Sequence, residues 1–239
     1  MKYANIYPNS STRSYDGSLR DYMYLVYRNV GMSLLVGGLA AFLVGSSRLM
    51  LNIFFSNWLV SVAVSLAPMF VIYGMGKNLY LLTVGELRGR LSIVACLMGI
   101  SLSPVFLIYT GQSIAVTFLT AAITFGSMSL YGYLTKRDLM ALGSFLLMGL
   151  IGILSASLVN LFLRSSRLEY TISIVGVIVS TLLVAFDVQK LRILHSRYAG
   201  SGEETLEKIA IMGSLELYID FVNLFMYLLR FFGERKRQD

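Results

Sequence analysis

Seven apolar stretches of membrane-spanning length follow one another along the chain, separated by mostly short polar segments. A transmembrane helix needs roughly 20 predominantly apolar residues to cross about 30 Å of hydrocarbon. The candidate spans are residues 29–45, 58–75, 91–109, 113–134, 139–163, 170–186 and 209–229. No Pro/Ser-rich linker or internal repeat divides the chain. The pattern predicts an all-α integral membrane protein, folded as a seven-helix bundle in one domain.

The polar segments between and around the spans indicate an orientation. Residues 1–28 are interpreted as a cytoplasmic N-terminal arm, residues 29–232 as the transmembrane bundle and residues 233–239 as a short basic tail. Most of the 20 Lys and Arg residues fall on the side of the N-terminus, which favours a cytoplasmic N-terminus. Seven full crossings would place the basic tail outside, against the same rule. The last segment is therefore left open between a full span and a re-entrant helix.

Small residues and prolines inside the spans predict how the helices pack. Gly149 and Gly152 in the fifth span would let neighbouring backbones approach closely. Pro68 and Pro104 lie inside the second and third spans and are expected to kink them.

Composition excludes several classes of function. The chain has 239 residues, of which 56% are hydrophobic and only 14% charged, whereas soluble domains carry about 25% charge. One cysteine, Cys96, allows no intrachain disulfide, and one histidine, His195, is too few for a histidine-based zinc site. The net charge of +7 is assigned to membrane orientation and not to nucleic acid binding. No cofactor is expected.

Acidic residues within the last span are the strongest functional signal. A charged side chain at the centre of a span costs about 2.5–3.5 kcal/mol even on lenient scales. Glu216 and Asp220 are four residues apart and therefore share a helix face, and that face continues through Asn223, Tyr227 and Arg230. A helix with such a polar stripe cannot face lipid on all sides. We expect it at the centre of the bundle.

A third acidic residue, Asp187, ends the apolar part of the sixth span. If the sixth helix continues past it, Asp187 can meet Asp220. Two carboxylates that share a poorly solvated site cannot easily both ionise, so the pair would act as a pH-sensitive latch. Fully ionised, it would attract a hard cation such as Ca²⁺. The alternative is structural: Asp187 pairs with Lys190, and Asp220 with a hydroxyl or with Arg230.

A second polar line runs down the fourth span. Its members recur near helical spacing, at Thr117, Thr120, Thr124, Ser127 and Tyr131. Hydroxyls in this arrangement either line a pore or bond to the backbone of their own helix. The sequence leaves both readings open.

Several long motifs resemble the Bax inhibitor-1 family in its bacterial branch. They are the runs FGSMSLYGYLTKRDL at 125–139, MGLIG at 148–152, ASLVN at 156–160, IMGSL at 211–215 and LYIDFVNLF at 217–225. The resemblance implies a bundle of six or seven helices with the last helix at its centre, in the bacterial inner membrane. It also implies a pH-sensitive calcium leak channel whose aspartate sensor maps onto Asp187 and Asp220. One bacterial branch of the family is similar to a modulator of a membrane-bound protease.

The chain departs from the family pattern at several positions. Phe186 and Val188 flank Asp187 where relatives carry hydroxyl or ring partners, and Glu216 adds a third carboxylate. The second span lacks the arginine that latches the aspartates in some members, so Arg230 or Lys77 would have to replace it.

Three functions compete at this point. The first is a calcium or cation leak pathway gated by the carboxylate pair. The second is a regulatory protein that binds a membrane protease or another membrane complex through the polar arm, residues 1–22. The third, an intramembrane aspartyl protease, is disfavoured because Leu217, Tyr218 and Ile219 precede Asp220 where those enzymes have Gly-x-Gly. We therefore expect no enzyme; the oligomeric state is left open.

Overall fold

The computed structural model describes residues 10–236, with side chains from residue 18 onward. Its helices are α1 (Ser10–Ser46), α2 (Arg48–Phe55), α3 (Trp58–Lys77), α4 (Val84–Leu102), α5 (Val105–Ile108), α6 (Gly111–Leu134), α7 (Gly143–Leu163), α8 (Ser166–Tyr198) and α9 (Glu203–Phe232), with a short 3₁₀ turn at Met140–Leu142. Seven of these stretches are long and apolar enough to cross a membrane. The predicted all-α membrane bundle is confirmed.

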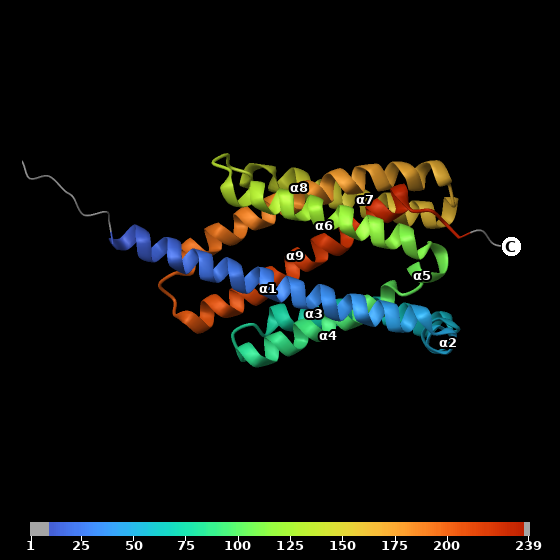
Figure 1. Cartoon of the computed structure of the whole chain (residues 1–239), viewed down its shortest axis with the longest axis horizontal. Helices are drawn as coiled ribbons and strands as arrows, with labels where there is room; N and C mark the ends of the chain where they lie inside the picture. Colours follow the sequence, from blue (N-terminus) through green and yellow to red (C-terminus); the bar gives the residue numbers. More distant parts are fainter. Residues whose placement is uncertain (1–9, 237–239) are drawn as a thin grey trace, which may run out of the picture.

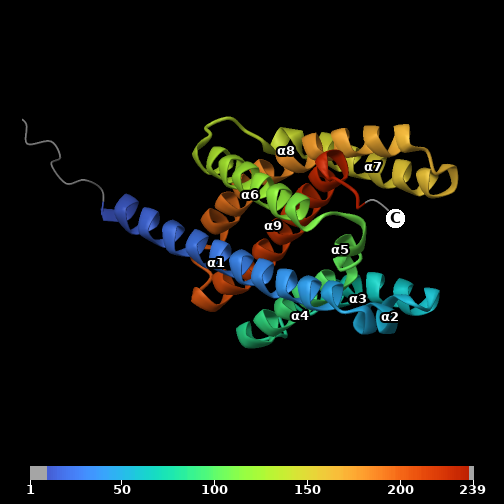
Figure 2. The ribbon, with the colours of Figure 1, turned by 45° about the vertical axis from the view of Figure 1, so that its right-hand side comes forward.

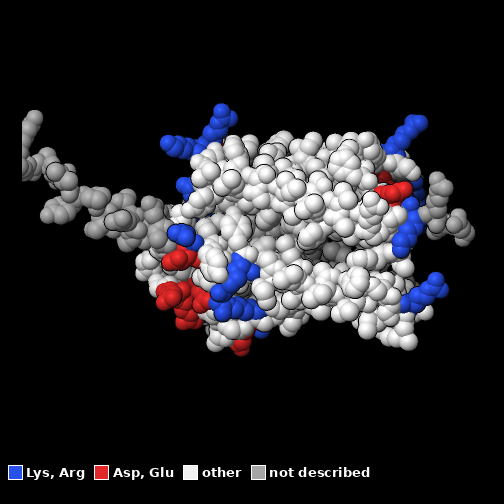
Figure 3. All heavy atoms as spheres, in the orientation of Figure 1, with Lys and Arg blue, Asp and Glu red and all other residues white. Residues whose placement is uncertain are grey.

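The helices run between two ends that carry the charged residues. The start of α1 and the loops after α3, α6 and α8 lie together at what we call the N-terminal end, while α2, α5 and the end of α9 lie at the opposite end (Figure 1). Lys, Arg, Asp and Glu gather at these two ends and leave an uncharged band between them (Figure 3). This is the surface expected of a protein whose middle contacts lipid tails.

Helix α9 occupies the centre of the bundle and packs against α8, α1, α6 and α4. It passes behind α1 and α6 as one unbroken helix (Figure 2). At its far end the carbonyl of Glu234 accepts a hydrogen bond from the Thr110 amide at 3.0 Å, beside α5. The last helix therefore crosses the whole bundle, and the re-entrant alternative does not describe this structure.

Two boundaries differ from the sequence prediction. Residues 18–28 do not form a separate polar arm; they belong to α1, and Leu19, Tyr22 and Val26 are buried. These three residues recur at helical spacing and form one buried face, but the polar residues between them made the segment look like a polar arm in the sequence. Residues 1–9 of the predicted arm lie outside the described residues. At Pro104 the third span is broken and not only kinked: α4 stops at Leu102 and the short helix α5 starts at Val105, both within the membrane-length stretch Val84–Ile108, because proline cannot continue the hydrogen-bond ladder.

The sixth span continues beyond its apolar part, as the Asp187–Asp220 hypothesis requires. Helix α8 runs through Asp187 to Tyr198, and its connection to α9 is only residues 199–202. The segment between the predicted sixth and seventh spans, residues 187–208, is therefore mostly helical. Buried Val188, Leu191 and His195 continue the face that packs in the bundle.

Candidate functional site

The acidic residues of the last two long helices form one cluster with a lysine. Asp187 and Lys190 lie on α8, three residues apart, and Glu216 and Asp220 lie on α9, four residues apart. These spacings put each pair on one helix face. Because α8 and α9 pack against each other, both faces meet inside the bundle. Two carboxyl groups, of Asp187 and Glu216, therefore lie within 4 Å of the Lys190 ammonium group, and the Asp220 carboxyl lies in the same cluster.

Lys190 joins the two helices electrostatically. Its Nζ lies 2.9 Å from Glu216 Oε2 and donates a hydrogen bond to it, and it lies 3.7 Å from Asp187 Oδ1. Asp187 thus pairs with Lys190, as the structural alternative predicted, but Lys190 also pairs with Glu216. Arg230 and Lys77, the cations considered from the sequence, do not take this place among the described ion pairs.

Asp220 is the carboxyl group of the cluster with the fewest polar contacts. Its residue is 6% exposed, and its Oδ2 has no hydrogen-bond partner among the described residues. The Asp187 carboxyl, itself on a residue that is 8% exposed, lies close enough to interact electrostatically with it. The two aspartates thus lie on neighbouring helices within electrostatic range of each other. A carboxyl in this setting can share a proton with its neighbour, whereas two bare carboxylates repel.

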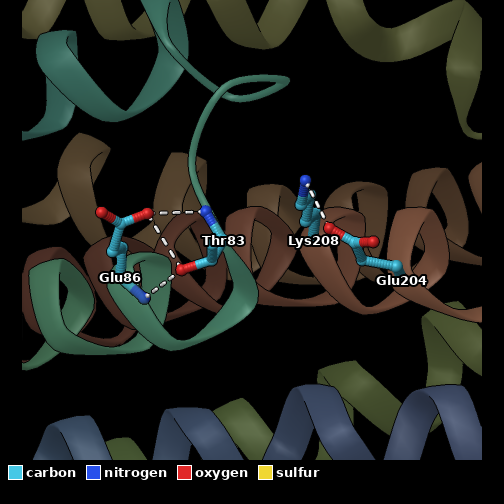
Figure 4. A network of polar contacts seen from close by, with 4 residues as sticks. All are labelled: Thr83, Glu86, Glu204 and Lys208. Carbon is cyan, nitrogen blue, oxygen red and sulfur yellow. Dashed lines mark hydrogen bonds and ion pairs between the residues drawn. The ribbon is translucent and has the colours of Figure 1, made fainter.

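A cavity connects the cluster to the N-terminal end of the bundle. Its volume is about 500 Å³, which is within the range of small-molecule sites. Glu216 lines it, and Glu204 and Lys208, 2.9 Å apart, stand at the first turns of α9. Figure 4 shows this ion pair near the start of α4, where Thr83 and Glu86 cap the helix reciprocally. Water and ions can therefore approach Glu216 from this end.

Apolar side chains surround α9 between Asp220 and the opposite end of the bundle. Beyond Asp220, α9 buries Leu224, Leu228 and Leu229. The Tyr227 ring lies against Gly176 of α8, where a Cβ would have no room. On another side of α9, a mainly apolar cavity of about 470 Å³ lies among α1, α4, α5 and α6, and Phe221 and Phe225 line it.

The remaining members of the predicted stripe have different surroundings. Asn223 is half-buried, and Tyr227 packs within a core cluster that includes Val179 and Leu183 of α8. Arg230 is exposed at the opposite end. The stripe thus faces protein over Glu216, Asp220 and Tyr227, as expected from its polarity.

The polar residues along α6 do not line a pore through the bundle. Thr124 Oγ1 donates to the Thr120 carbonyl of its own helix at 2.9 Å. Ser127 and Tyr131 are exposed on the outside of the bundle, Tyr131 at 44%. The hydroxyls are satisfied locally or face the surroundings, which is the second of the two sequence readings.

The structure does not assemble a resident calcium site at Asp187 and Asp220. Calcium takes 6–8 oxygen ligands, and Glu216 is turned to Lys190. No group of three or more His, Cys, Asp or Glu side chains among the described residues could hold a metal ion.

The sequence did not predict that α1 contributes side chains to the surroundings of the acidic cluster. The buried Tyr22 ring packs 5.2 Å from the His195 ring, and the Tyr22 hydroxyl lies within electrostatic range of Glu216. Ser18 Oγ lies 3.0 Å from His195 Nε2. The apolar spacing of Leu19, Tyr22 and Val26 was the available signal, but it was masked by charged neighbours.

Removing Lys190 should destabilise the bundle in a pH-dependent way. Lys190→Gln leaves Asp187 and Glu216 without their shared cation, and we expect a loss of about 1 kcal/mol near neutral pH, since Lys190 and Glu216 are partly exposed. The loss should shrink in acid, where the carboxyls take up protons. Thermal unfolding in detergent at several pH values measures this. Lys190→Gln/Glu216→Gln should recover part of the stability; an equal loss at every pH would contradict the assignment.

Comparison with known proteins agrees with this architecture. The family model described as "Inhibitor of apoptosis-promoting Bax1" matches residues 19–237. A protein of Rickettsia prowazekii is 41% identical over 95% of both chains. The inner membrane protein YbhL of Escherichia coli K12 is 38% identical, covering 91% of this chain and 93% of its own. A membrane protein of Streptococcus pyogenes is 35% identical, covering 91% and 94%. The chain is therefore a membrane protein of the Bax inhibitor-1 family.

Proposed function

We propose that the protein is a pH-sensitive leak pathway for cations, calcium above all, gated by Asp187 and Asp220. The observation that carries the proposal is the placement of Asp220. Its carboxyl is buried in the central helix, has an oxygen without a partner among the described residues, and faces a second buried carboxyl. Ionisable residues inside membrane spans are costly and typically serve ion or proton pathways. A leak of this kind needs no cofactor and no covalent chemistry.

Protonation sets whether the pair holds α8 and α9 together. With one proton present, the two carboxyls share a hydrogen bond across the helix contact. With none, two unit charges about 4 Å apart repel by roughly 4 kcal/mol at an effective dielectric constant of about 20. Lys190 offsets part of this repulsion through Asp187, and Glu216 adds to it. From α1, the Tyr22 hydroxyl is the titratable group that faces the cluster.

Ionisation should therefore separate the two helices beyond Asp220 and admit a cation. A repulsion of a few kcal/mol is enough to shift a two-state equilibrium by roughly 100-fold. The apolar contacts of Leu224, Leu228 and Leu229 are the barrier that must open. The same ionised pair supplies the negative charge that draws the cation in. On this argument, leak rises with pH.

The cavity that reaches Glu216 would face the cytoplasm. Most Lys and Arg residues lie at the N-terminal end of the bundle, which favours that orientation. The relative from Escherichia coli is named an inner membrane protein, which supports the same location here. Cations would then reach the cluster from the cytoplasmic side and meet the apolar side chains beyond it.

Calcium flux into liposomes tests the proposal. Purified protein is reconstituted with a trapped calcium indicator and flux is recorded from about pH 5 to 8, the range over which a shared proton would leave a buried carboxyl pair. We expect flux above that of empty liposomes, rising with pH. No flux at any pH from protein shown to be folded would overturn the leak pathway and favour the alternative, a regulatory membrane protein that binds a membrane protease or another membrane complex.

A further inference from the structure

A basic cavity lies at the N-terminal end of the bundle, away from the acidic cluster. It is formed by the loop between α6 and α7 and by the last turns of α8, and its volume is about 570 Å³. Its polar lining includes Lys136, Arg137, Arg192, Asp138 and Gln189. Three cationic side chains therefore share one hollow with a single carboxylate.

The positive charge of this cavity is not neutralised by the protein. Lys136, Arg137 and Arg192 take part in none of the ion pairs found among the described residues. The one nearby carboxylate, Asp138, accepts a hydrogen bond from the Met140 amide at 2.9 Å, which places it as a cap of the following turn. A concentration of unpaired cations at a fixed position favours an anionic ligand.

The walls of the cavity are held in place by hydrogen bonds. Gln189 of α8 donates to the Arg137 carbonyl and accepts from the Leu139 amide, both at 2.7 Å, so the loop is clamped to the helix. Arg192 donates to the Tyr133 carbonyl, and its guanidinium lies 5.7 Å from the centre of the Tyr133 ring. The loop backbone and the Arg192 side chain are thus positioned before any ligand binds, which lowers the entropic cost of binding.

An apolar cleft adjoins the basic cavity on the membrane side. It measures about 270 Å³ and shares Arg137 and Asp138 with the cavity, while Leu142, Leu182 and Ala185 line its apolar part. A charged chamber that continues into an apolar cleft matches the two parts of a phospholipid. A free phosphate ion would fill only the first.

We propose that this site binds an anionic phospholipid from the leaflet at the N-terminal end, with its phosphate between Arg137 and Arg192 and one acyl chain entering the cleft. Arginine binds phosphate through paired N–H donors, and basic pockets between membrane helices are a recurring form of anionic lipid site. The inference is independent of the leak pathway. Because Gln189 and Arg192 lie within one turn of Asp187 and Lys190 on α8, a bound lipid would hold the helix that carries half of the acidic cluster.

Lipid binding to the delipidated full-length protein in detergent tests the proposal. The probes are phosphatidylglycerol, phosphatidylcholine and inorganic phosphate at equal concentration, read by native mass spectrometry and by thermal stabilisation. We expect phosphatidylglycerol to bind and stabilise, and the other two to have little effect. Equal binding of phosphatidylcholine, or equal stabilisation by inorganic phosphate, would overturn the anionic lipid assignment.

Charge-removing variants locate the site. Arg137→Gln and Arg192→Gln should each weaken phosphatidylglycerol binding about tenfold, the scale of one lost charge-assisted phosphate contact. Arg197→Gln is the matched control, because it removes the same charge from an exposed position on the same helix end outside the cavity. Arg137 uses only its backbone in the clamp, so its variant should fold even if Arg192→Gln does not. An Arg197→Gln effect as large as that of Arg137→Gln would contradict the site.

Discussion

Asp220→Asn is expected to reduce calcium flux at about pH 8 to the level that the wild-type protein shows at about pH 5, and to flatten the pH dependence between them. Asparagine has nearly the same shape as aspartic acid, and its amide can donate a hydrogen bond to an ionised Asp187. The variant thus imitates the protonated pair at every pH. The roughly 4 kcal/mol repulsion between two charges about 4 Å apart is then absent, so the change in flux should be large, of the order of 100-fold at high pH.

Two further variants sharpen this result. Asp187→Asn should behave like Asp220→Asn, because either change removes one of the two facing charges. Glu216→Gln is the matched control: Glu216 binds Lys190 at 2.9 Å, so its loss should change the size of the flux but keep the pH dependence. Flux in Asp220→Asn that stays as steep in pH as in the wild type would exclude the pair as the gate, provided thermal unfolding shows the variant to be folded.

Gly132→Ala should destabilise the protein by about 1–3 kcal/mol, the usual cost of overpacking a tight contact. Gly132 of α6 lies against the backbone of Ala185 in α8, where an added Cβ would clash with the carbonyl group. Backbone atoms cannot rotate away as a side chain can, so α6 and α8 must move apart. Because Ala185 is two residues from Asp187, that movement should also disturb the acidic cluster.

Gly126→Ala is the control for this substitution. Gly126 lies on the same helix, and nothing stands within 4 Å of a Cβ added there. Alanine is favoured over glycine in a helix by about 1 kcal/mol, so Gly126→Ala should leave stability unchanged or raise it. The midpoints of thermal unfolding in detergent compare the two. Similar midpoints for both variants would show that the contact between α6 and α8 yields to a methyl group.

The sequence alone determined the properties that depend on local pattern. Runs of about 20 apolar residues specify spans, because a helix in lipid must satisfy its backbone hydrogen bonds internally. The spacing of Glu216 and Asp220 specified a polar face on the last helix, and a face that cannot contact lipid predicted a central position. The pairing of Asp187 with Asp220 was a hypothesis that required the sixth helix to continue past Asp187.

Only the tertiary structure decided which side chains meet, since that depends on the rotation and depth of each helix against its neighbours. The sequence could not show that Lys190 serves Glu216 as well as Asp187, or that Asp220 keeps an oxygen without a partner among the described residues. It could not place Ser127 and Tyr131 outside the bundle, because hydroxyl spacing is the same on an inner and an outer face. The clamp of Gln189 on the loop after α6 joins residues about 50 positions apart, and no local pattern encodes such a contact.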